Sequence, residues 1–306
     1  MARVLIFIGH YLPATRTGGP ARSVASMTKF LKNEEFYIFT SETDFKSSKV
    51  LDGIAVDTWQ HRDSARVIYV SRQNRGLKGL RRSLNRIAPE VIYLNSYFAR
   101  RFTLPILVFR KLRLVPRYPV IVAPRGEFSP GALAIKSVRK HIYLSLARIL
   151  GLYRDIVWHA CSAMEVNDIR RVQGSQATII LASNFPPIPH PDALAQHRTK
   201  QPNLCRLVFL SRISPKKNLV GALQALALVS GRVEFDIYGP IEDTAYWAQC
   251  QQALKTLPPN ILARHSGAVD PDRGRRVAGH GVRVSGTRSS RVPRRPAAGC
   301  WTGRSR

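Results

Sequence analysis

Two kinds of apolar pattern alternate along most of the chain. Short continuous runs such as residues 4–8 are typical of buried strands, whereas residues 77–87 repeat leucine and isoleucine at the spacing of a helix with one apolar face. Strands that alternate with helices predict an α/β fold with mainly parallel sheets. The helix at 77–87 also carries four basic residues, which suits either a membrane surface or solvent; we expect its leucines to pack on the sheet.

The pattern predicts elements along almost the whole chain. Strands are predicted at residues 4–8, 36–40, 54–58, 67–70, 91–94, 120–123, 156–160, 178–181, 206–211, 233–238 and 261–265. Helices are predicted after Gly19 and at residues 77–87, 103–114, 135–151, 163–173, 219–229 and 246–254. A proline-dense stretch interrupts the alternation, because proline cannot continue a helix or a central strand. We therefore predict one domain at 1–183, a linker at 184–202 and a second domain at 203–272.

One loop of the second domain gathers positive charge. Arg212, Lys216 and Lys217 follow the strand at 206–211 and precede a helix that starts near Asn218. The carboxyl ends of parallel strands are where ligands bind in such folds, and a helix start presents unpaired N–H groups and a partial positive charge there. The pattern favours an anion site, and a solvated basic turn is the alternative for the loop taken alone.

Two loops of the first domain also follow strands. Gly18 and Gly19 precede the first helix, and glycine lets backbone N–H groups approach a ligand, although a tight turn without a ligand has the same composition. Arg125 and Glu127 lie in the proline- and glycine-rich loop at 124–131. They are candidates for contacts with a bound ligand, and a salt-bridged loop is the alternative.

The Gly-Gly loop, the Ser-Asn-Phe-Pro-Pro break at 183–187 and the Arg-x4-Lys-Asn loop ending at Asn218 occur here in the order found in GT-B glycosyltransferases. Over about residues 1–270 the chain resembles the retaining group numbered four, the glycosyl transferases group 1. The resemblance implies two Rossmann-like domains facing a cleft. It also implies transfer of a sugar, with retention, from a nucleotide-sugar to a saccharide or lipid-linked acceptor in bacterial polysaccharide synthesis.

The resemblance also implies roles for individual residues. Donor phosphates would contact Gly18, Gly19, Arg212 and Lys217; the nucleotide would contact Gly239; the acceptor or sugar would contact Arg125 and Glu127. Many members carry a histidine just before the glycine of the loop after the strand at 120–123, where this chain has Arg125, so the catalytic residue stays unassigned. The scheme needs no cofactor and no metal, and no Asp-x-Asp motif occurs to hold one.

The end of the chain departs from the family pattern. The resemblance implies two glutamates separated by seven residues, but no acidic residue follows Asp272, and residues 273–306 hold ten Arg and no Lys. We expect an incomplete second domain, a disordered tail and weak or absent activity. A reading-frame shift explains an Arg-rich tail best; a basic arm for phosphate backbones or anionic lipid and an ordinary disordered terminus are the alternatives.

The bulk charge of +29 adds a second functional hypothesis. Residues 1–272 hold all 19 acidic and 38 of the 48 basic residues, so this part alone is at +19 and should be drawn to anionic surfaces. A non-enzymatic protein that binds anionic membrane or nucleic acid is thus the alternative, although no nucleic-acid-binding motif occurs. An NAD-binding domain is disfavoured because G-x-G-x-x-G is missing after the first strand.

The cysteines and the lengths of the apolar runs indicate the cellular compartment of the protein. The four cysteines form no C-x-x-C pair, which disfavours a zinc site or a disulfide framework and suits a reducing compartment. No apolar run reaches the roughly 18 residues of a membrane span. We expect a cytoplasmic protein, with peripheral contact at the inner face of the plasma membrane.

Overall fold

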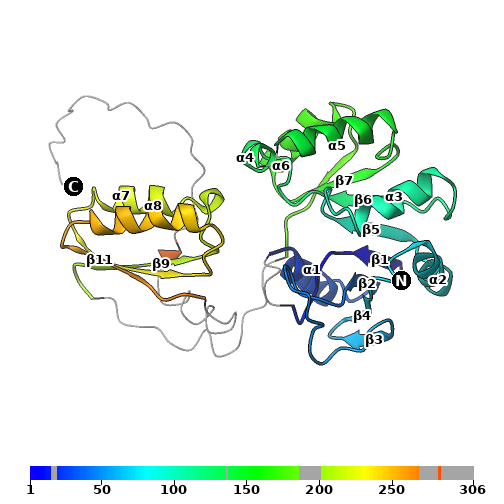
Figure 1. Ribbon diagram of the computed structural model, residues 1–306, viewed down its shortest axis with the longest axis horizontal. Helices are drawn as coiled ribbons and strands as arrows, with labels where there is room; N and C mark the ends of the chain where they lie inside the picture. The colour runs from blue at the N-terminus through cyan, green and yellow to red at the C-terminus, as the bar shows by residue number, and fades with distance from the viewer. Residues whose placement is uncertain (15–18, 136, 186–200, 269–281, 284–306) are drawn as a thin grey trace, which may run out of the picture. The chain divides into compact units, whose positions relative to one another are not determined.

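The structure is a computed structural model that describes residues 1–14, 19–135, 137–185, 201–268 and 282–283 (Figure 1). The chain forms two compact units, Met1–Ile188 and Pro189–Arg306, and each is described by itself. The division falls inside the stretch predicted as a linker. Most of that linker lies outside the described residues, so its bounds stay a prediction.

The first unit is built on an eight-stranded sheet in the order β3-β4-β2-β1-β5-β6-β7-β8. All pairings are parallel except that of β3 with β4. The strands are β1 (Arg3–Phe7), β2 (Glu35–Ser41), β3 (Trp59–Arg62), β4 (Ala65–Val70), β5 (Val91–Asn95), β6 (Val120–Ala123), β7 (Val157–Ala160) and β8 (Ile179–Leu181). The carboxyl ends of the central strands therefore share one edge of the sheet.

Helices cover both faces of this sheet (Figure 1). They are α1 (Gly19–Phe30), α2 (Leu77–Ile87), α3 (Thr103–Lys111), α4 (Pro130–Ala134), α5 (Ser137–Ile149) and α6 (Ala163–Gln173). Alternate residues of β1 join different cores: Leu5 packs with the cluster that includes α2, α3 and α6, whereas Ile6 packs with the cluster that includes α1. This alternation follows from the pleat of a strand, in which successive side chains point to opposite faces.

The second unit has a parallel four-stranded sheet in the order β11-β10-β9-β12. Its elements are β9 (Leu204–Leu210), the short 3-10 helix η2 (Pro215–Lys217), α7 (Leu219–Leu226), β10 (Arg232–Tyr238), α8 (Thr244–Lys255), β11 (Ile261–His265) and β12 (Val282–Arg283). Phe209, Leu223 and Phe235 are fully buried in its core. The predicted α/β class is confirmed for both units.

Three predicted elements differ from the structure. The strand expected at 54–58 is not formed; β3 lies just after it and pairs with β4 through a two-residue turn at Asp63, whose φ is 52°. The helix expected at 135–151 corresponds to α5 alone, which starts only at Ser137; the separate short helix α4 precedes it and ends at Ala134, because Ile135 is extended. In the segment expected to be disordered, β12 pairs with Leu207 and Val208 of β9, an otherwise open edge. Residues 284–306 lie outside the described part, so disorder there stays a prediction.

Candidate functional site

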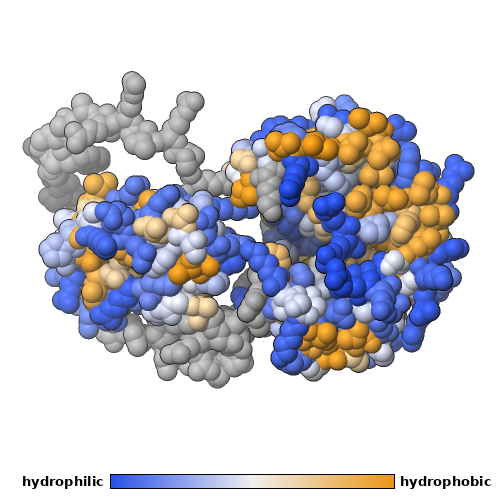
Figure 2. All heavy atoms as spheres, viewed as in Figure 1, coloured by the Kyte–Doolittle hydropathy of each residue, from blue (hydrophilic) through white to orange (hydrophobic). Residues whose placement is uncertain are grey.

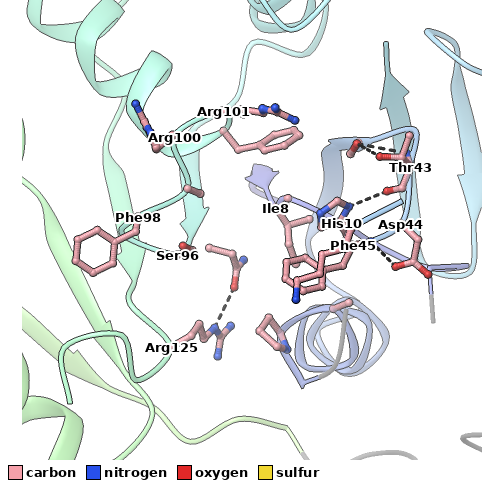
Figure 3. Close-up of a pocket in the computed structure, with 18 of the residues that line it drawn as sticks. Ile8, His10, Thr43, Asp44, Phe45, Ser96, Phe98, Arg100, Arg101 and Arg125 are labelled. Atoms are coloured by element: carbon pink, nitrogen blue, oxygen red, sulfur yellow. Dashed lines mark hydrogen bonds between the residues drawn. The ribbon is translucent and has the colours of Figure 1, made fainter. Parts of the chain in front are cut away.

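A cavity of about 640 Å³ opens in the first unit at the carboxyl edge of its sheet (Figure 3). Its walls come from the loops that follow β1, β2, β5 and β6, and from the start of α1. Arg125 and Glu127 both line it, as do Pro20 and Ala21 directly after Gly19. The fold thus brings the predicted acceptor-side residues to the same cavity as the start of α1. Gly18 lies outside the described residues.

Arg125 is held by three partners from distant parts of the first unit. Its backbone has a φ of 55°, and its guanidinium donates to Asn95 Oδ1 at 3.0 Å, to the Tyr93 hydroxyl at 3.0 Å and to Asn184 Oδ1. Ser23 of α1 also donates to Asn184 Oδ1, at 2.7 Å. The Arg125 side chain therefore joins the ends of β5 and β6 to the segment that follows β8.

A directed chain of hydrogen bonds continues from Arg125. The Ala182 carbonyl can only accept, so His159 Nε2, 2.8 Å away, carries the proton. His159 Nδ1 must then accept from the Tyr93 hydroxyl at 2.6 Å, and that hydroxyl accepts from Arg125. Burial, helped by the nearby Arg125 charge, lowers the pKa of His159. Both ring nitrogens of His159 are thus used in hydrogen bonds within the first unit, and the residue acts as a structural link.

Glu127 is engaged by the loop that follows β5. Its carboxylate accepts from the Ser96 hydroxyl at 2.6 Å, from the Tyr97 N–H at 2.6 Å and from the Phe98 N–H at 3.2 Å. Burial raises the pKa of Glu127, and these hydrogen bonds oppose the rise. Its geometry suits positioning of this loop, and direct contact with a sugar stays a prediction.

The second unit brings together its own three predicted residues. Arg212 follows β9 and forms an ion pair with Glu242 at 2.8 Å. Lys217 ends η2, and burial lowers the pKa of its ammonium group, as do the nearby charges of Arg212 and Lys216. Gly239 follows β10, and a Cβ at this position would lie 1.8 Å from the Ser211 carbonyl oxygen. The structure therefore gives Gly239 a packing role, and its predicted contact with a nucleotide stays untested by the geometry.

The start of α7 differs from the expectation of unpaired N–H groups. The Val220 N–H donates to the Tyr246 hydroxyl at 3.0 Å, and the Gly221 N–H donates to the Asn218 side chain at 3.3 Å. These two donors are satisfied within the unit, because Asn218 acts as a helix cap. Any anion held at this edge would depend mainly on the full charges of Arg212, Lys216 and Lys217 rather than on the helix end.

The described residues contain no group of three or more His, Cys, Asp or Glu side chains arranged to hold a metal ion. Within that same part of the chain, no helix combines the length and the apolar character needed to cross a membrane. Neither finding changes the geometry of the two sites.

The sequence matches no protein-family model and no curated protein. Solved structures are similar in fold. The Anabaena protein Alr3699/HepE, in complex with UDP and glucose, aligns with a TM-score of 0.58 at 14% identity, over 91% of this chain and 72% of that one. A glycosyltransferase from Rickettsia africae aligns with a TM-score of 0.57 at 12% identity, over 93% and 72% of the two chains.

The chain has the GT-B fold. A trehalose 6-phosphate synthase from Burkholderia multivorans is also similar, with a TM-score of 0.50 at 12% identity, over 90% of this chain and 73% of that one. At such identities the likeness establishes the fold alone.

Several residues of the first cavity were not predicted. Asn95 on β5 and Arg100 and Arg101 in the loop after β5 line it, whereas Tyr93 on β5 and His159 on β7 lie behind Arg125 as its hydrogen-bonded support. The sequence does place Asn95 at the end of an apolar run, the same signal that pointed to Arg125. The hydrogen bonds that make Tyr93 and His159 partners connect positions 66 residues apart, for which the sequence pattern holds no signal.

Proposed function

We propose that this protein is a glycosyltransferase that moves a sugar from a nucleotide-sugar donor to a hydroxyl of a saccharide or lipid-linked acceptor. The observation that carries the proposal is the basic loop of the second unit, where Arg212 and Lys217 stand at the carboxyl edge of a parallel sheet, in a fold shared with a protein solved with UDP and glucose. Retention at the anomeric carbon and a role in bacterial polysaccharide synthesis are part of the proposal and rest on the sequence resemblance.

In this proposal the second unit binds the donor and the first unit binds the acceptor. Arg212 and Lys217 stabilise the negative charge that develops on the nucleoside diphosphate as it leaves. Burial lowers the pKa of Lys217 most, and the nearby charges of Arg212 and Lys216 lower it further; a bound phosphate would oppose both effects. Gly19, at the start of α1, has open space around its Cβ direction, which leaves room for a ligand.

The proposal is tested by titrating the full chain with UDP, UDP-glucose and other nucleotide-sugars. Removing a charge-assisted hydrogen bond costs about 1.5–3 kcal/mol, so Arg212→Ala and Lys217→Ala should each weaken donor binding about 10-fold or more. Lys255→Ala is the matched control, since Lys255 is exposed at the end of α8 in the same unit. If no nucleotide-sugar binds, or if the control loses as much affinity as the two site variants, the proposal fails.

Turnover is a separate part of the proposal. No acidic residue follows Asp272 that could act as the glutamate pair of the resembling family, so we expect donor binding with weak transfer. Where transfer is measurable, each of the two substitutions should lower it about 100-fold, the scale of removing one preorganised charge stabiliser. Nuclear magnetic resonance of the anomeric proton in the product reports whether configuration is retained.

We also propose peripheral contact with an anionic membrane, and one surface of the first unit supports it. Six apolar residues on and beside α5 are each more than half exposed: Ile135, Val138, Ile142, Leu146, Ile149 and Leu150. The four of them within α5 recur every three or four positions and so lie on one side of the helix. We call the six residues together the α5 face; they contribute to the apolar surface seen in Figure 2. Between Glu127 and Asp155 all charged residues are basic. This charge would attract anionic lipid, whereas it would repel the same surface of a second copy of the chain.

Sedimentation with vesicles tests the α5 face. Binding to phosphatidylcholine vesicles that contain phosphatidylglycerol should exceed binding to phosphatidylcholine alone, because each basic residue near an anionic surface contributes about 1 kcal/mol. The double substitution Ile142→Ser and Leu146→Ser should reduce this binding about 10-fold or more. Leu228→Ser is the control, since Leu228 is 89% exposed in the second unit. Equal binding by both variants would refute this contact.

A further inference from the structure

The amide of Asn95 is an unsatisfied donor at the wall of the first-unit cavity. Asn95 is 2% exposed and ends β5. Its Oδ1 accepts from Arg125 Nε at 3.0 Å, and since a guanidinium can only donate, the orientation of the amide is fixed. Nδ2 then has no partner among the described residues, although it is buried. A buried donor without an acceptor costs about 1–3 kcal/mol, and because Asn95 lines the cavity, a molecule bound there can supply the acceptor.

The charges around the cavity are strongly unequal. Its lining contains five basic side chains and two acidic ones: Lys46, Arg75, Arg100, Arg101, Arg125, Asp44 and Glu127. Both oxygens of Glu127 already accept hydrogen bonds from the loop after β5. Asp44 Oδ1 accepts from the next backbone N–H at 2.6 Å. The acceptors of the cavity are therefore largely used within the protein.

Three of the basic side chains lack a hydrogen bond or ion pair within the described part of the chain: Lys46, whose ammonium group lies over the Phe45 ring, Arg100 and Arg101. Arg125 is committed to its three partners, and Arg75 donates to Ser41 at 2.8 Å and lies 3.8 Å from Glu42. Arg100 and Arg101 are exposed, and within the described part of the chain they form no hydrogen bond or ion pair. Burial lowers the pKa of Arg75, and the charge of Arg101 adds to that lowering, so the two cations are close enough to repel.

The donor and acceptor balance of the cavity decides what it can bind. A saccharide without charge is recognised through hydroxyl groups that donate as well as accept, so its site needs free acceptors such as carboxylates. Among the charged and amide side chains that line this cavity, the groups without a partner in the described part of the chain are donors: Asn95 Nδ2, Lys46 Nζ and the guanidinium groups of Arg100 and Arg101. His10 adds one acceptor, Nε2, because its Nδ1 donates to the Thr43 carbonyl at 2.7 Å. Guanidinium groups pair best with planar or tetrahedral oxyanions, often through two hydrogen bonds at once.

We infer that the acceptor saccharide carries an oxyanion, a phosphate or a carboxylate, bound by Arg100 and Arg101, while Asn95 Nδ2 donates to a neighbouring ligand oxygen. Figure 3 places Arg100 and Arg101 on one side of the cavity and Arg125, which orients Asn95, on the other. The inference rests on the proposed function, which assigns this cavity to the acceptor. It narrows the acceptor to acidic or phosphorylated saccharides.

Calorimetric titration of the full chain tests the inference with three probes: glucose 1-phosphate, glucuronate and methyl glucoside. Saturating UDP is present throughout, so that the proposed donor site cannot take up the sugar phosphate. At least one anionic probe should bind about 10-fold or more tightly than methyl glucoside, which is the scale of a charge-assisted hydrogen bond. Comparison of the two anionic probes then identifies phosphate or carboxylate as the preferred group. Equal affinity for all three probes would overturn the inference.

Matched variants assign the effect to the named residues. The double substitution Arg100→Ala and Arg101→Ala should abolish the preference for the anionic probe. The double substitution Arg82→Ala and Arg86→Ala removes the same charge from exposed positions of α2 that do not line the cavity, and it should keep the preference. If both double variants lose the preference equally, the general charge of the protein is responsible and the inference fails.

Asn95→Asp is the sharpest single substitution. An aspartate keeps an oxygen for Arg125 but replaces the free donor by an acceptor, so anionic probes should bind at least 10-fold more weakly. Thermal unfolding checks that the variant is folded. UDP-glucose titration of the same samples separates the two proposals: unchanged donor binding with no anion preference refutes this inference alone, whereas failure to bind any nucleotide-sugar refutes the proposed function.

Discussion

Gly239 offers the most direct test of how the second unit is built. An added Cβ would lie 1.8 Å from the Ser211 oxygen, and about 1.2 Å of backbone movement is needed to reach the 3.0 Å below which real Cβ contacts do not fall. Such a movement would strain the bond from the Ser211 N–H to the Tyr238 oxygen, now 3.0 Å long. A broken buried bond costs about 1–3 kcal/mol, and the φ of 146° adds about 1–3 kcal/mol for any other residue.

Gly239→Ala should therefore destabilise the second unit by about 2–6 kcal/mol, a large share of the 5–15 kcal/mol typical of a domain. Denaturant unfolding followed by circular dichroism measures the loss. Gly267→Ala has a strained φ of 72° but no atom within 4 Å, so it should cost only about 1–3 kcal/mol. Gly231→Ala has neither problem and should be close to neutral. If Gly239→Ala costs no more than Gly267→Ala, the clash is relieved freely and the reasoning is wrong.

Three further predictions concern single groups. Because burial raises the pKa of Glu127 above its ordinary 4.5, folding stability should fall as pH rises from that value through the raised one, and Glu127→Gln should flatten this part of the unfolding curve. The pKa of the Cys161 thiol is raised to about 11, so iodoacetamide at pH 8 should modify the exposed Cys205 before Cys161, as mass spectrometry can show; faster labelling of Cys161 would contradict this. Glu242→Gln breaks a half-exposed ion pair with Arg212 and should change unfolding free energy by less than about 1 kcal/mol, with a larger loss pointing to a structural role for the pair.

Periodicity predicted the fold where local signals and tertiary structure agree. The bounds of α2 and α6 are those expected, and α6 is capped by Ser162, whose side chain accepts from the Glu165 N–H. Leu80, Leu84 and Ile87 of α2 are buried and Leu77 is partly buried, as predicted for a helix that packs on the sheet. The missed strand β3 has a different cause, since it depends on pairing with β4 rather than on its own half-exposed residues.

The sequence predicted which loops carry residues of the candidate sites, but it did not predict the contacts that those residues make. Arg125, Glu127 and Arg212 were placed in loops after strands because apolar runs end just before them. Their partners could not be predicted in this way: Asn184 contacts Arg125 across 59 positions, and Glu242 pairs with Arg212 across 30. Whether a polar residue is free or committed depends on such long-range contacts, and that distinction separates Arg100 and Arg101 from Arg125.

The register of the second sheet has a consequence for the order in which it forms. Val233 pairs with Cys205 and Ile261 pairs with Val233, each 28 positions away, whereas Val282 of β12 reaches back 75 positions to Leu207. Closing a longer loop costs more chain entropy before any contact is gained. We expect β9, β10 and β11 to assemble first as a nucleus, and β12 to join a sheet that already exists. During synthesis the outer edge of β9 is then open until β12 has left the ribosome.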